Sequence, residues 1–94
     1  MPAYIVGTIT VRDEASWARY LAGVAETFRR YDGEVLLRAA GPVPLAGRAQ
    51  GERVVVARFA SMAGLRRWFD SPEYQALIPL RDAAADVVLT AYED

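Results

Sequence analysis

The start of the chain has the pattern of a strand followed by a helix. Residues 4–11, YIVGTITV, are rich in β-branched side chains and alternate in polarity, which predicts a β-strand. Apolar residues then recur at helical spacing between Asp13 and Gly33, which predicts an amphipathic helix. We expect Asp13 to cap the start of this helix and Gly33 to close its end in the left-handed conformation. The predicted apolar stripe consists of Trp17, Tyr20, Leu21, Val24, Phe28 and Tyr31.

The rest of the chain predicts three more strands and a broken helix. The strands are expected at residues 34–39 (EVLLRA), 52–59 (ERVVVARF) and 86–93 (DVVLTAYE), with a Pro/Gly loop at 41–51. Ser61 should cap one short helix, and Ser71 should cap a second. Pro72 suits the first position of that second helix, where no backbone N–H needs a partner. Pro79 should kink or end it after roughly two turns, since proline cannot donate a backbone hydrogen bond.

The order of these elements is β-α-β-β-α-β, with the second helix in two pieces. This order predicts a ferredoxin-like α+β domain, in which helices cover one face of a four-stranded antiparallel sheet. A chain of 94 residues has room for one hydrophobic core. We therefore treat residues 1–94 as a single domain.

Alternation along the strands predicts two different sheet faces. The face under the helices should be apolar and carry Ile5, Gly7, Ile9, Val11, Val35, Leu37, Ala39, Val55, Ala57, Phe59, Val87, Leu89 and Ala91. The opposite face should carry Tyr4, Val6, Thr8, Thr10, Leu36, Arg38, Val54, Val56, Arg58, Val88, Thr90 and Tyr92. This second face is too apolar for open water and too polar for a plain core. We expect it to pack on a second copy of the chain, so that a dimeric barrel encloses a semi-polar cavity.

Composition and charge favour self-association over other macromolecular partners. Hydrophobic residues make up 53% of the chain, above the usual range of roughly 45–50%, and an oligomer interface is the usual place for such a surplus. The net charge of −1 provides no attraction to nucleic acid or to anionic membranes, so we expect neither as a partner. The first residues read as a strand rather than a signal peptide, and no stretch has membrane-spanning length. A cytoplasmic homodimer is the resulting expectation.

Missing residue types exclude several kinds of chemistry. The chain contains no His, Cys or Lys, which excludes thiolate and Schiff-base catalysis, Ser–His and Ser–Lys pairs, and haem bound through His. We expect no metal site and no cofactor. No glycine-rich phosphate loop is present, and the third strand has Val54–Val56 where an RNA-recognition domain needs stacking aromatic residues.

Two arginines are the leading candidates for ligand binding. Arg38 and Arg58 each lie in an apolar strand, on the face that we expect to be enclosed. A buried guanidinium needs a counter-charge, and its planar fork suits a carboxylate. The partner would be either an anionic ligand or an acidic residue across the dimer. Alternatively, each arginine extends its charged head into water at the mouth of the barrel. The other candidate cavity residues are Tyr4, Thr8, Trp17, Trp68, Thr90 and Tyr92, with Arg81 as a further candidate contact.

Several segments resemble a family of small bacterial proteins known as domain of unknown function 1330, or DUF1330. These segments are MPAYIVGTITV, YDGEVLLR, VVVARF and SPEYQALIPLR, and in this order they span nearly the whole chain. The resemblance implies a dimeric α+β barrel, in which two βαββαβ sheets pair. Relatives commonly carry Leu-Glu-Gly in the loop after the second strand, where this chain has Leu45-Ala46-Gly47. Any role of that glutamate is therefore absent here.

Three functions remain open at this point. The first is a homodimer that binds a small anionic or aromatic organic molecule in the barrel cavity. The second is a cofactor-independent monooxygenase or isomerase acting on a small aromatic or lactone substrate, because the superfamily that the resemblance implies includes such enzymes. The third is a structural or partner-binding dimer with a lumen filled by side chains. No catalytic residue is assigned from the sequence.

Overall fold

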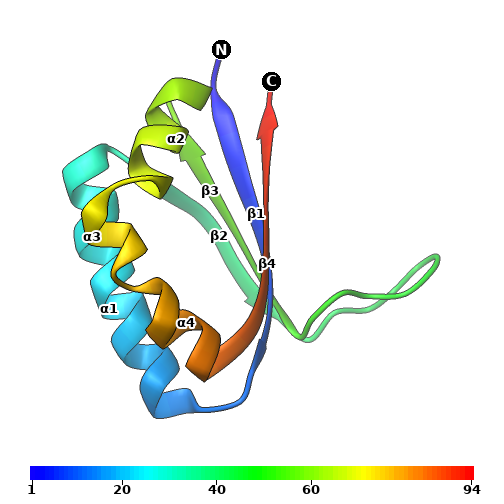
Figure 1. Ribbon diagram of the computed structural model, residues 1–94. Coiled ribbons are helices and arrows are strands. Elements are labelled where there is room, and N and C mark those ends of the chain that lie inside the picture. Colours follow the sequence, from blue (N-terminus) through cyan, green and yellow to red (C-terminus); the bar gives the residue numbers. More distant parts are fainter.

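The computed structural model describes residues 1–94 as two layers, a sheet and a set of helices that all lie on one of its faces (Figure 1). The strands are β1 (Ala3–Val11), β2 (Glu34–Ala40), β3 (Arg53–Phe59) and β4 (Ala85–Glu93). The helices are α1 (Glu14–Tyr31), α2 (Met62–Phe69), α3 (Pro72–Gln75) and α4 (Ile78–Ala84). The sheet is antiparallel with the order β2-β3-β1-β4, which confirms the predicted ferredoxin-like α+β fold. None of the helices is both long and apolar enough to cross a lipid bilayer.

The predicted helix starts are confirmed by side-chain caps. The Asp13 carboxylate accepts hydrogen bonds from the backbone N–H groups of Ala15 and Ser16 at the start of α1. The bond from the Ser16 N–H is the main reason that the pKa of Asp13 lies below its usual value, because it favours the ionised carboxylate. Ser61 and Ser71 cap α2 and α3 through their hydroxyl oxygens.

Two predictions about helix ends are wrong. The left-handed residue after α1 is Asp32, with a φ of 61°, and not Gly33. Helix α3 ends at Gln75, earlier than the two turns expected, and Pro79 lies in the first turn of α4 instead of ending α3. A proline is well placed there because the first N–H groups of a helix have no partner within the helix.

The core lies between the helices and the sheet face that they cover. It is formed by Ala3, Ile5, Ile9, Ala57, Phe59 and Ala85 from the sheet and by Trp17, Tyr20, Val24, Leu65, Trp68, Tyr74 and Ala84 from the helices. Alternate residues of β1 and β3 supply most of the sheet side, as the period-two pattern predicts for those strands. The opposite face carries no helix and is called the open face below (Figure 1).

Strand β2 departs from the predicted alternation because it contains a β-bulge. Val35 pairs with Ala57. Leu37, two residues further along β2, pairs with Val56, which is only one residue away from Ala57 in β3. Leu36 is therefore an extra residue in β2. An extra residue reverses the side of the sheet to which every later side chain of the strand points.

The bulge changes the position of three residues relative to the prediction. Leu37 and Ala39 lie on the open face, although the sequence placed them under the helices. Arg38 pairs with Val55 and so lies on the helix-covered face, although the sequence placed it on the opposite one. The prediction for this half of β2 is wrong.

Gly33 is required because a side chain at this position would clash with its neighbours, and not because of its backbone conformation. A Cβ atom at this position would lie 2.8 Å from Cζ of Phe59 and 3.0 Å from the ring of Phe28. We predict that Gly33→Ala lowers the free energy of unfolding by about 1–3 kcal/mol, as overpacking of a core typically does. Urea unfolding followed by tryptophan fluorescence measures this change.

Asp32→Gly is the matched control for this substitution. Its left-handed backbone suits glycine, so the control should be as stable as the wild type or up to about 1 kcal/mol more stable. Equal urea midpoints for Gly33→Ala and the wild type would contradict the packing explanation.

Candidate functional site

A cavity of about 500 Å³ lies between α1 and the sheet, and 16 of its 18 lining residues are hydrophobic. The volume falls within the range of roughly 300–1,000 Å³ that is typical of small-molecule sites. One wall comes from the strands and the other from aromatic and aliphatic residues of α1, with Trp68 from α2. We call it the α1 cavity.

Its two charged residues, Arg38 and Arg53, differ in their pairing. Arg53 donates from Nη2 to the Glu14 carboxylate in the first turn of α1, at 2.8 Å from Oε1. Arg38 is exposed and forms no ion pair and no side-chain hydrogen bond. The β2 bulge thus brings one uncompensated positive charge to a cavity that is otherwise apolar. A guanidinium in this position is suited to a carboxylate or another planar anion.

The aromatic wall of the cavity is held in place by its own contacts. The rings of Trp17 and Tyr20 are stacked, with centroids 4.9 Å apart. Trp68 donates from Nε1 to the buried Thr27 hydroxyl at 2.9 Å, and that hydroxyl donates to the Val24 carbonyl at 2.8 Å. Such a wall changes little when a ligand enters, which reduces the entropy lost on binding.

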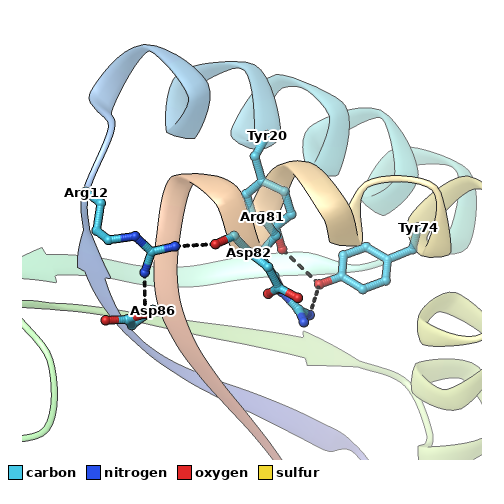
Figure 2. Close-up of polar contacts among 6 residues, drawn as sticks. All are labelled: Arg12, Tyr20, Tyr74, Arg81, Asp82 and Asp86. Carbon is cyan, nitrogen blue, oxygen red and sulfur yellow. Dashed lines mark hydrogen bonds and ion pairs between the residues drawn. The ribbon is translucent and has the colours of Figure 1, made fainter.

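A chain of hydrogen bonds connects the cavity wall to α3 and α4 (Figure 2). The hydroxyls of Tyr20 and Tyr74 lie 2.9 Å apart, and Arg81 donates from Nη1 to the Tyr74 hydroxyl at 3.2 Å. Arg81 also donates from Nε to Oδ1 of Asp82 at 3.0 Å. Burial, with a smaller effect of Tyr74, raises the pKa of Tyr20 above its usual value, so its phenol stays protonated. Burial lowers the pKa of Arg81, but its bonds to Asp82 and Tyr74 outweigh this and raise it.

The direction of these bonds leaves one phenol hydrogen without an acceptor. Because a guanidinium can only donate, the Tyr74 oxygen must accept from Arg81. The Tyr20–Tyr74 bond uses one of the two phenol hydrogens, and no further acceptor is in contact with either hydroxyl. When Tyr74 is the donor, the free O–H belongs to Tyr20, which forms part of the cavity wall.

Arg12 fixes the end of β1 against the start of β4 beside this network. It donates to the Asp86 carboxylate and to the Asp82 carbonyl (Figure 2). The ion pair is partly exposed, so we expect it to contribute little to stability. Across the chain, no three His, Cys, Asp or Glu side chains are grouped as metal ligands.

The structure separates the nine residues that the sequence singled out. Arg38, Trp17 and Trp68 line the α1 cavity. Five others lie on the open face by strand register: Tyr4, Thr8, Arg58, Thr90 and Tyr92. Arg81 contacts Tyr74 and Asp82 in the hydrogen-bond chain.

On the open face, the candidate residues form a cross-strand group. Tyr4 of β1 lies between Arg58 of β3 and Tyr92 of β4 in the register. Thr8 is notable because its hydroxyl oxygen is buried without a hydrogen-bond partner. Such an atom is commonly completed by water or by a neighbouring molecule.

Sequence reasoning did not select Arg53 or Tyr20 as site residues. Arg53 is the first residue of β3, and nothing in the sequence indicates that its side chain would contact Glu14 of α1. Tyr20 belonged to the apolar stripe of its helix, and only the fold brings Tyr74 to its hydroxyl.

Comparison with known proteins identifies the family of the chain. The profile of the family described as Domain of unknown function (DUF1330) matches residues 2–94, so the chain belongs to that family. This confirms the resemblance seen in the sequence. No curated protein sequence matches the chain.

Solved structures show the same fold at low sequence identity. A protein of unknown function from Rhodopseudomonas palustris has a TM-score of 0.83 and 20% identity, covering 99% of this chain and 82% of its own. SnoaB, a cofactor-independent oxygenase from Streptomyces nogalater, has a TM-score of 0.70 and 18% identity, with 99% and 92% covered. A dimeric ferredoxin-like protein of unknown function from Thermobifida fusca has a TM-score of 0.65 and 15% identity, with 100% and 92% covered.

The Tyr74 hydroxyl is predicted to hold α1, α3 and α4 together. In Tyr74→Phe, both the Arg81 guanidinium and the buried Tyr20 hydroxyl lose their shared partner. We expect the free energy of unfolding to fall by about 1–3 kcal/mol, the range for a buried polar group left without a partner. Thermal and urea unfolding measure it.

Tyr31→Phe provides the control for the loss of a hydroxyl. Tyr31 donates to Oε1 of Glu73 at 3.0 Å in a part-buried position. In this variant the Glu73 carboxylate keeps its ion pair with Arg30, so no buried polar group loses its partner and the loss of stability should be smaller than in Tyr74→Phe. If the two variants lose equal stability, the network has no special role.

Proposed function

We propose that this member of the DUF1330 family binds a small, largely apolar organic molecule with one negative charge in the α1 cavity. The observation that carries this proposal is the composition of the cavity, an apolar space of about 500 Å³ with one unpaired cation, Arg38. Burial of the apolar body supplies most of the binding free energy, at roughly 25 cal/mol per Å² removed from water. The guanidinium then selects molecules that carry an anionic group.

The α1 cavity has only one arginine without an ion-pair partner, which favours a ligand with one negative charge over a ligand with two. Arg53 is already neutralised by Glu14, so a second negative charge would have to displace that carboxylate. The aromatic side chains that line the cavity, Trp17, Tyr20, Phe28 and Trp68, favour an aromatic body. An aromatic monocarboxylate meets both requirements.

This proposal places the ligand beneath the helices instead of in the lumen of a dimeric barrel. Arg38, Trp17 and Trp68 support the cavity, whereas Arg58, Tyr4 and Tyr92 face the other way. A ligand in the α1 cavity should depend on Arg38 for its affinity, whereas a ligand in the barrel lumen should depend on Arg58. Substituting each arginine tests the difference.

We also propose that the chain forms a homodimer through its open face. The support is the exposure of Leu36, Leu37, Val88 and Tyr92 on or beside that face. Isologous packing of two such faces would remove this apolar surface from water. The dimeric relative from Thermobifida fusca has the same fold.

A second candidate function is cofactor-independent oxygenation or isomerisation of such a ligand. It is supported by the fold shared with SnoaB and by the Tyr20 hydroxyl at the cavity wall, which has a free hydrogen when Tyr74 is the donor in their shared bond. A Tyr20 hydroxyl could donate to a carbonyl oxygen that gains negative charge during the reaction. In the oxygenation, the substrate would supply the electrons itself, because the chain contains no Cys thiol to supply them.

Binding is tested with naphthoate, an aromatic monoanion, and with naphthamide, its neutral counterpart. We predict that Arg38→Gln weakens naphthoate binding by about 10–100-fold, as expected for a lost charge-assisted hydrogen bond, and leaves naphthamide binding unchanged. Isothermal titration calorimetry measures both affinities.

Arg58→Gln is the control, because Arg58 lies on the open face. It should bind naphthoate as the wild type does. If Arg58→Gln is the variant that weakens binding, the ligand lies in the barrel lumen and the α1 cavity proposal is wrong.

The catalytic alternative predicts oxygen uptake. With planar phenols that bind the protein, consumption of O₂ should exceed the rate without protein, as followed with an oxygen electrode. Tyr20→Phe should then lower kcat more than it changes KM, because the hydroxyl would act on the transition state. Uptake that does not depend on the protein would leave binding as the function.

A further inference from the structure

The loop between β2 and β3 projects from the body of the protein as an arm. We define the arm as residues 41–51, and Figure 1 shows it extending from the end of the sheet, away from the helices. Residues 41–50 are all exposed, and the side chains of Val43 and Leu45 are 79% and 96% exposed. Two large aliphatic side chains are therefore left in water with nothing of their own chain to cover them.

The root of the arm is fixed to the sheet. The Glu52 N–H donates to the Ile9 carbonyl at 2.8 Å, and the Gly41 N–H donates to the Glu52 carbonyl at 3.1 Å. Gly51 has a φ of 73°, and a Cβ atom there would lie 2.8 Å from the backbone nitrogen of Ile9. The direction of the arm is thus set by backbone contacts at its root.

The arm adds apolar surface beside the open face. A typical specific interface buries about 800 Å² on each partner, and the exposed side chains of Val43 and Leu45 would add to the area that the open face supplies. The arm extends on the same side of the molecule as this face (Figure 1). A partner seated on the open face would meet both surfaces at once.

We propose that the arm docks on a second copy of the chain, with Val43 and Leu45 buried against the partner. This inference rests on the proposed homodimer. The arm carries only one charged residue, Arg48, so it suits an apolar surface better than a charged one. In a two-fold dimer each copy supplies one arm and receives the other, so every arm contact occurs twice.

A photo-crosslinking experiment tests the location of the arm directly. The chain has no cysteine, so Leu45→Cys gives a single site for a benzophenone label. Irradiation of a mixture of unlabelled and ¹⁵N-labelled protein should yield mixed-isotope crosslinks, identified by mass spectrometry. Glu26→Cys on the exposed side of α1, with a side chain that is 70% exposed, is the control and should give none.

The contribution of the arm to the stability of the dimer is measured by sedimentation velocity on the double variant Val43→Ser/Leu45→Ser. We expect the dimer dissociation constant to rise by about 10–100-fold, because two aliphatic side chains per copy lose their burial. Arg48→Ser, an exposed polar position in the same arm, should change it by less than about twofold.

The possible outcomes distinguish a failure of the arm-contact proposal from a failure of the homodimer proposal. A wild-type dimer whose dissociation constant is unchanged in the double variant, or whose crosslinks stay within one chain, overturns the arm contact and leaves the homodimer standing. A wild-type protein that sediments as a monomer at high micromolar concentration overturns both. Neither result affects ligand binding in the α1 cavity, which the two arginine variants test separately.

Discussion

The constraint behind the whole structure is that its helices cover only one face of the sheet. A sheet with hydrophobic side chains on both faces must bury both, and all four helices of this chain pack on the same side. The covered face gives the core and the α1 cavity. The open face, on which Tyr92 is 56% exposed, has no helix to cover it. The proposals for ligand and partner thus arise from opposite faces of one sheet.

The bulge in β2 is the reason that a positive charge lies at the α1 cavity. The extra residue at Leu36 reverses the alternation, so Arg38 comes to the covered face, where an unbroken strand would have placed an aliphatic side chain. An unpaired arginine does nothing for the stability of a core. Its cost is low here because its head remains exposed while its neighbours form an apolar wall. The ligand proposal rests on this arginine, which has an exposed head and no partner within the chain.

Sequence patterns predicted the fold well but did not predict which side chains surround the α1 cavity, for one physical reason. The period of two in β1 and β3 and the caps at Asp13, Ser61 and Ser71 are local properties, and the structure confirms them. A bulge depends on how two strands pair, so the sequence of β2 alone could not reveal it. Arg38 and Arg58 therefore looked equivalent in the sequence although they point to opposite faces. The Tyr20–Tyr74 contact joins residues 54 positions apart and was equally invisible.

The donors around the cavity also limit the chemistry that it could support. Arg38, Arg81 and the Tyr20 phenol, whose pKa is raised, are hydrogen-bond donor groups, and none of them is a base near neutral pH. Glu14, a carboxylate that contacts the cavity residue Arg53, is held in that ion pair. A site of this kind stabilises negative charge on a bound molecule but does not create it. Any reaction there must therefore begin with a substrate that is already anionic or acidic enough to ionise in water, and this is the same property that the proposed ligand needs in order to bind.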